Sequence, residues 1–212
     1  VVDTAIAGRI DTLSLGATGL GTTLFMVGSI IGIGIVLGVD PILSQTFGAG
    51  HPRQARKTMW QGVWTGLLLT LPAAGVIFLL HAFLEPFGVS APLAKKTGEY
   101  VFARLPELVP LMVFVSIRAY LQAAHRVGPI VLAMLASNLL NIPADFVMAF
   151  GDEGLVKVGL TSIGLPAFGV RGLGWVSAAV TTLEVIIGLF VLRKIDPGKG
   201  TFPLARPDRK LM

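Results

Sequence analysis

Cysteine is absent from the 212-residue sequence, and charged residues are scarce. Without cysteine, the chain can form neither a disulfide framework nor a thiolate metal site. Charged residues make up 14% of the chain, whereas soluble domains average about 25%. Hydrophobic residues make up 53%, and the chain is rich in glycine (26) and proline (13), as membrane helices are. The composition therefore argues against a soluble domain and predicts an all-α membrane protein.

Sequence signatures of catalysis are also missing. The chain contains no nucleophile elbow, no P-loop and no dinucleotide-binding fingerprint, and its three histidines lack the spacing of metal ligands. The net charge of +5 comes from basic residues that lie between apolar runs and in the tail, not along one face. We therefore expect a protein that is not an enzyme, needs no cofactor and binds no nucleic acid.

Long runs with few charges mark the membrane-spanning helices. A bilayer core about 30 Å thick requires roughly 20 apolar residues per helix. Five runs meet this length: residues 13–39, 58–80, 98–124, 128–150 and 172–192. The apolar start of the chain predicts the far end of one more helix, whose first part is missing. The sequence thus predicts a polytopic six-helix bundle over residues 1–194, with its first helix truncated, and a cytoplasmic linker over the Pro- and Gly-rich residues 195–212.

The distribution of arginine and lysine predicts the orientation in the membrane. If the connection after the second helix is cytoplasmic, the cytoplasmic side holds ten basic residues and the outer side holds five. Basic residues favour the cytoplasmic side of a membrane protein. We therefore expect an integral protein of the bacterial inner membrane, with the long connection over residues 151–171 exposed as an outer loop.

The most polar face of the predicted helices lies in residues 128–150. Asn138, Asn141 and Asp145 share this face, because side chains three and four positions apart are neighbours on a helix. Pro143 removes a backbone donor, which leaves the carbonyl of Leu139 without its usual partner. Such a face at membrane depth predicts a site for a proton or for a small cation such as sodium. The alternative is that the asparagines only hydrogen-bond to neighbouring helices.

A second carboxyl group, that of Asp3, lies in an otherwise apolar, small-residue stretch. Burial disfavours the charged form of a carboxyl group, so such a group can hold a proton and release it when water or a cation arrives. If Asp3 and Asp145 face one cavity, they form one carboxylate site that proton and substrate occupy in turn. The alternative is that Asp3 is a solvated carboxylate near Arg9.

Further charged residues occur inside the predicted spans. Glu107 and Arg118 share a helical face about 16 Å apart along the axis, but a local Arg104–Glu107 ion pair is the simpler interpretation. Arg118 lies near the inner end, where it can extend toward water or pair with a carboxylate.

Glu184 occupies the middle of the last predicted helix, with Thr181 and Thr182 one turn before it. Its role stays open between an ion-coupling group and a structural one.

Five short motifs, in this order, resemble those of the multidrug and toxic compound extrusion (MATE) transporters. They cover residues 2–9, 41–50, 118–122, 140–145 and 169–172, and the second of them contains Gln45. Ala123 departs from the pattern, because glycine is usual at that position.

The resemblance implies the N-terminal lobe of a twelve-helix exporter, joined by residues 195–212 to a C-terminal six-helix lobe. Members of the family export organic cations in exchange for protons or sodium, through a cavity that opens alternately to each side of the lipid membrane. Their N-lobe polar network corresponds here to Asp3, Asn141 and Asp145, which would hold the proton or sodium. A threonine of the sixth helix belongs to this network in some members, and Thr181 or Thr182 would correspond to it. From their own positions in the sequence, Asn138, Gln45, Arg118 and Glu184 are further supporting candidates, although Glu184 has no counterpart in the family pattern.

Two other functions stay open at this point. A lipid-linked precursor flippase of the same superfamily would need several arginines facing the cavity to bind an anionic headgroup. A membrane scaffold that transports nothing would use the polar face of residues 128–150 only to pack against other helices.

Overall fold

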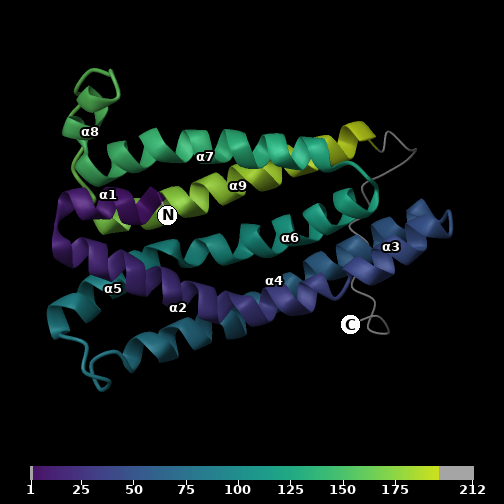
Figure 1. Cartoon of the computed structure of the whole chain (residues 1–212), viewed down its shortest axis with the longest axis horizontal. Helices are drawn as coiled ribbons and strands as arrows, with labels where there is room; N and C mark the ends of the chain where they lie inside the picture. Colours follow the sequence, from purple (N-terminus) through teal and green to yellow (C-terminus); the bar gives the residue numbers. More distant parts are fainter. Residues whose placement is uncertain (1, 196–212) are drawn as a thin grey trace.

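The computed structural model describes residues 2–195, and nearly all of them lie in helices that run along one common axis (Figure 1). In chain order the helices are α1 (Val2–Ile10), α2 (Thr12–Leu37), α3 (Asp40–Gly48), α4 (Pro52–Ala82), α5 (Ala91–Arg104), α6 (Leu108–Ala123), α7 (Val127–Phe150), α8 (Asp152–Lys157) and α9 (Val170–Ile195). A short 3-10 helix, η1 (Leu105–Glu107), joins α5 to α6. No strand occurs in residues 2–195, so the predicted all-α class is confirmed.

Five segments are long and apolar enough to cross a membrane: Thr12–Gly48, Pro52–Ala82, Ala91–Ala123, Val127–Phe150 and Val170–Lys194. Each contains one of the five runs predicted from the sequence, to within a residue at the ends. α1 has nine residues, which is about half a membrane thickness at 1.5 Å per residue. It packs against α2 and α7 as the remaining helix of the six-helix bundle.

The third of these segments is interrupted in its middle. Pro106 lies in η1, where its missing N–H prevents a continuous α-helical hydrogen-bond ladder. The chain therefore passes from α5 to α6 through one tighter turn. This turn holds Glu107, which is only 5% exposed.

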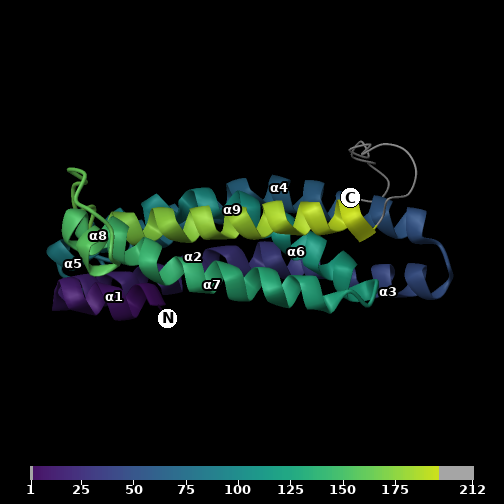
Figure 2. The same cartoon turned by 90° about the horizontal axis from the view of Figure 1, so that it is seen from above.

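Each long helix packs along its length against several neighbours. α9 lies against α5, α6 and α7, while α2 lies against α4 and α5 (Figure 2). Small residues allow these close approaches: Gly28 faces Ile77 of α4, and Gly32 and Gly66 both face the fully buried Met112 of α6. Helix association in membranes depends on such close van der Waals packing.

The two ends of the bundle differ in charge. The α3–α4 and α6–α7 connections and the last turn of α9 lie at the same end, where Arg53, Arg126 and Arg193 are found (Figure 1). α8 lies at the opposite end. This arrangement matches the two sides on which the basic residues were assigned from the sequence.

The segment predicted as a simple exposed loop, residues 151–171, is more ordered than expected. It contains α8, and Asp152 at the start of α8 organises the residues that follow. The Asp152 carboxylate accepts hydrogen bonds from the Ser162 hydroxyl at 2.6 Å and from the backbone N–H groups of residues 163, 164 and 165. One acidic side chain therefore closes the loop on itself.

The predicted boundary between bundle and linker falls at residue 195. α9 runs through Ile195. The rest of the predicted linker, residues 196–212, lies outside the described residues, so the linker stays a prediction.

Candidate functional site

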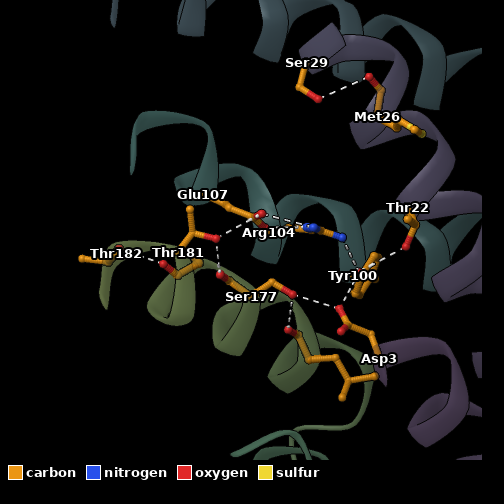
Figure 3. A network of polar contacts seen from close by, with 12 residues as sticks. Asp3, Thr22, Met26, Ser29, Tyr100, Arg104, Glu107, Ser177, Thr181 and Thr182 are labelled. Atoms are coloured by element: carbon orange, nitrogen blue, oxygen red, sulfur yellow. Dashed lines mark hydrogen bonds and ion pairs between the residues drawn. The ribbon is translucent and has the colours of Figure 1, made fainter. Parts of the chain in front are cut away.

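Asp3 of α1 is held by two hydroxyl groups from other helices. The Tyr100 hydroxyl of α5 and the Ser177 hydroxyl of α9 each donate a hydrogen bond to its Oδ2 atom, both at 2.9 Å (Figure 3). Tyr100 is completely buried, and its hydroxyl also lies 3.3 Å from that of Thr22 on α2. Asp3 thus joins the short α1 to three longer helices. Asp3 is half-buried and bonded to these hydroxyl groups, which argues against the alternative of a solvated carboxylate near Arg9. The Arg9 guanidinium lies over the Phe146 ring.

Asp145 of α7 is the most unusual side chain of the site. It is fully buried, and neither carboxylate oxygen has a hydrogen-bond partner among the described residues. Its carboxyl group lies near enough to that of Asp3 for the two charges to interact. Asn141, one turn earlier on the same face, is 8% exposed. A buried carboxyl without donors cannot remain charged at low energetic cost, so this position is suited to binding a proton or a cation.

Arg104, at the end of α5, connects Asp3 to a further carboxylate, that of Glu107. Its Nε and Nη2 atoms donate to the two carboxylate oxygens of Glu107 in a bidentate pair, the second bond at 3.1 Å. Its Nη1 atom donates to the Tyr100 hydroxyl at 2.8 Å, and the guanidinium lies 4.5 Å from the centre of the Phe25 ring. The local Arg104–Glu107 pair expected from the sequence is confirmed.

α9 contributes the other side of this polar network. The single proton of the Thr181 hydroxyl is shared between Glu107, at 3.3 Å, and the Ser177 carbonyl, at 3.0 Å (Figure 3). Glu184, one turn further along, is half-buried, and its charge interacts with that of Glu107. A continuous chain of hydrogen bonds therefore leads from Asp3 through Tyr100 and Arg104 to Glu107 and α9.

The family of this chain is shown by comparison with known proteins. The family model described as MatE matches residues 1–147. The chain belongs to the MatE family. Its expected kinship with MATE transporters is thereby confirmed, and with five apolar membrane-length helices it is an integral membrane protein.

Curated relatives of this MatE chain are multidrug resistance proteins. It is 28% identical over 184 residues to a "Probable multidrug resistance protein NorM" of Synechocystis, covering 86% of this chain and 40% of that protein. It is 27% identical to the Synechococcus protein of the same name, covering 99% and 43%, and 26% identical to "Multidrug resistance protein NorM" of Vibrio vulnificus, covering 89% and 39%. The chain thus spans about 40% of the length of these relatives.

Of the supporting residues predicted for the MatE chain, the structure brings Thr181 and Glu184 to the network. Thr182 is exposed, and its hydroxyl donates to the Ala178 carbonyl of its own helix. Asn138 is likewise exposed and donates to the Met134 carbonyl.

Two more predicted residues, Gln45 and Arg118, lie away from Asp3, toward the end of the bundle at which α3 and the α6–α7 connection are found (Figure 1). Gln45 is exposed on α3. Arg118 is half-buried between α6, α7 and α9, and its Nε atom has no hydrogen-bond partner among residues 2–195. Also at this end, a cavity of about 440 Å³ lies between α3 and α6, with Asp40 and Gln122 among its lining residues.

Sequence reasoning missed Tyr100 and Ser177, which hold Asp3. One signal was available: the chain contains only two tyrosines, and Tyr100 lies inside an apolar span where its hydroxyl must find a partner. Ser177 lies four residues before Thr181 and therefore on the same face of its helix. A search for polar neighbours at helical spacing would have added it to the candidates.

Proposed function

We propose that this chain forms one lobe of a secondary active antiporter that exports organic cations or drugs in exchange for protons or sodium by alternating access. The observation that carries the proposal is the fully buried Asp145, whose carboxylate oxygens have no partner among the described residues. Such a group needs a bound proton or cation while it is shielded from water. It can lose that ion when the cavity opens, which is the change an antiporter uses.

The cycle follows from competition for one negative site. With a proton or sodium bound, the Asp3–Asp145 pair carries less negative charge and holds a cationic drug weakly. When the ion leaves, the uncompensated carboxylate attracts the cation, and the next ion drives the drug out. Asn141, beside Asp145, supplies an amide that can bind either the carboxyl group or the coupling ion.

The proposed partners are an organic cation, the membrane lipids and a second, C-terminal six-helix lobe. The second lobe is proposed because the chain spans about 40% of its multidrug resistance relatives. In this arrangement the cavity forms between two lobes in a bacterial inner membrane. The Asp3–Asp145 pair would face this cavity, so that the coupling ion and the drug occupy the same site in turn.

The arrangement of charges favours this proposal over the two alternatives. A flippase for anionic lipid headgroups needs several arginines that face the cavity. Of the two candidates, Arg104 is engaged by Glu107 and Tyr100, which leaves Arg118 alone. A scaffold would use its buried polar groups to bind other helices. Asp145 instead has no such bond within the described residues.

The test is drug efflux by the full-length protein in vesicles, with Asp3→Asn and Asp145→Asn. We expect each substitution to abolish uphill efflux, because an amide cannot exchange a proton or balance a cation's charge. Glu153→Gln, which removes an exposed carboxylate from α8, is the matched control and should leave efflux unchanged. Undiminished transport in both aspartate variants would overturn the site.

A second comparison tests the amide. Asn141→Ala should impair efflux, whereas Asn138→Ala on the exposed side of the same helix should not. Imposing a pH gradient alone or a sodium gradient alone identifies the coupling ion, because only the gradient of the coupling ion drives efflux. If neither gradient drives efflux, the antiport proposal is wrong.

A further inference from the structure

The guanidinium of Arg104 lies between two pairs of carboxyl groups. On one side is Asp3, which it reaches through the Tyr100 hydroxyl, and beyond it Asp145. On the other side is Glu107, which it binds with two hydrogen bonds, and beyond it Glu184. The two pairs thus share this one cation.

Asp3 and Asp145 have unequal surroundings. Asp3 accepts hydrogen bonds from two hydroxyl groups, one of which also accepts a bond from the positively charged Arg104. Asp145 accepts none among the described residues. Hydrogen bonds to the charged form of a carboxyl stabilise that form, and a bond polarised by a cation does so more strongly.

We propose that Arg104 is a positioning residue that acts on the pair through the Tyr100 hydroxyl and thereby directs the coupling proton to Asp145, and that Glu107 limits the strength of this effect. This inference rests on the proposed function, because it assigns roles within the same ion-coupling pair. It adds that Arg104 and Glu107, which do not bind the proton themselves, set the pH at which the pair releases it.

The charged and titratable groups around the pair come from each element packed against it. They are Asp3 and Arg9 on α1, Tyr100 and Arg104 on α5, Glu107 on η1, Asp145 on α7 and Glu184 on α9. α2 contributes the uncharged Thr22. Arg9 lies against Phe146, whereas Arg104 is connected to Asp3 through the Tyr100 hydroxyl.

This arrangement predicts shifts of opposite sign. Removing the positive charge of Arg104 makes ionisation of the pair less favourable, so the pair should release its proton at a higher pH. Removing the negative charge of Glu107 leaves the guanidinium uncompensated, so the pair should release its proton at a lower pH. Glu184→Gln should act in the same direction as Glu107→Gln but more weakly, because Glu184 is half-buried and one step further away.

The experiment is an infrared pH titration of the purified full-length protein, following the C=O stretching band of protonated carboxyl groups. The band that disappears in Asp145→Asn identifies the pair. We expect its midpoint to rise by about one pH unit in Arg104→Gln and to fall by about one pH unit in Glu107→Gln. Thr182→Val, which changes an exposed hydroxyl on α9, should leave the midpoint unchanged.

Breaking a buried ion pair can prevent folding, so a second variant is needed. Tyr100→Phe keeps every charge and removes only the hydroxyl that bridges Arg104 and Asp3, and it should raise the midpoint. Equal shifts in the same direction for Arg104→Gln and Glu107→Gln, or no shift in Tyr100→Phe and Glu107→Gln, would overturn the inference. A protein that exports no drug but shows the opposite shifts would contradict the proposed function and support this assignment of the proton.

Discussion

At the residue scale, Thr181 and Thr182 are adjacent on α9 but have different surroundings. Thr181 is 9% exposed, and its hydroxyl is shared between a carbonyl of its own helix and the buried carboxylate of Glu107. Thr182 is exposed, and its hydroxyl donates to a carbonyl of its own helix. A hydrogen bond to a charged group contributes about 1.5–3 kcal/mol, roughly twice a neutral one. The two positions therefore form a natural pair for measuring the network.

We expect Thr181→Val to lower the free energy of unfolding by about 1–2 kcal/mol, because it leaves a buried carboxylate with one donor fewer. Thr182→Val should change it by less than about 0.5 kcal/mol. Unfolding in mixed micelles, followed by circular dichroism, measures both. Equal losses in the two variants would show that Glu107 does not depend on the Thr181 hydroxyl.

The stability of the loop that Asp152 organises, outside the membrane-spanning segments, should depend on pH. The Ser162 hydroxyl, followed by the backbone N–H groups of the loop, holds the pKa of the Asp152 carboxyl below its usual range. Because the folded pKa is lowered, the contribution of Asp152 to loop stability is present above the ordinary carboxyl pKa. It is lost as the pH falls through the folded value.

We therefore expect Asp152→Ala to speed hydrogen exchange at the amides of Ile163, Gly164 and Leu165 at neutral pH. In the unsubstituted protein, the protection of these amides, corrected for intrinsic exchange, should decrease on acidification. Glu153→Ala, at the exposed neighbouring position, is the control and should leave exchange unchanged. Unaltered exchange in Asp152→Ala would mean that other contacts hold the loop.

At the element scale, the glycines of α2 are not equivalent. A methyl group at Gly28 would overlap the side chain of Ile77, which is fully buried on α4. At Gly34 nothing lies within 4 Å of the position that a methyl group would occupy. Both glycines begin a small-xxx-small pattern in the sequence, but only the first lies in a close helix contact.

Gly28→Ala should therefore destabilise the bundle by about 1–3 kcal/mol, since the α2–α4 contact must open. Gly34→Ala should be neutral or stabilise by up to about 1 kcal/mol, because alanine is the better helix former. Thermal unfolding of the two variants in the same detergent measures the difference. A larger loss for Gly34→Ala would contradict the packing of α2 on α4.

The five membrane-length segments could be predicted from the sequence because a long apolar run is itself the signal of a membrane helix. It could not predict the rotation of each helix about its axis. The buried face of α7 is centred on Ser137, Asn141 and Asp145, which follow one another at four-residue steps, so Asn138 lies beside this face and is exposed. The Tyr100 and Ser177 hydroxyl groups that bond to Asp3 were missed for a related reason. They belong to residues 97 and 174 positions away, and no local pattern encodes such a pairing.

At the scale of the whole molecule, the absence of cysteine makes the orientation testable. A single cysteine introduced at Gly159, in the loop beyond α8, should react with a membrane-impermeant maleimide added outside intact cells. One introduced at Gly50, between α3 and α4 at the opposite end, should react only after the cells are opened. The reverse pattern would contradict the orientation derived from arginine and lysine.

The hydrogen bond between Ser177 and Asp3 also has a consequence for biosynthesis. The two residues are separated by 174 positions, so Ser177 leaves the ribosome long after α1 has been made. Until α9 is synthesised, Asp3 lacks one of its two donors, and an unsatisfied carboxylate is disfavoured in the hydrocarbon core. The segment that contains Asp3 should therefore take its final place only when the last helix of the bundle inserts. Assembly of the carboxylate pair would then be a late step in making the protein.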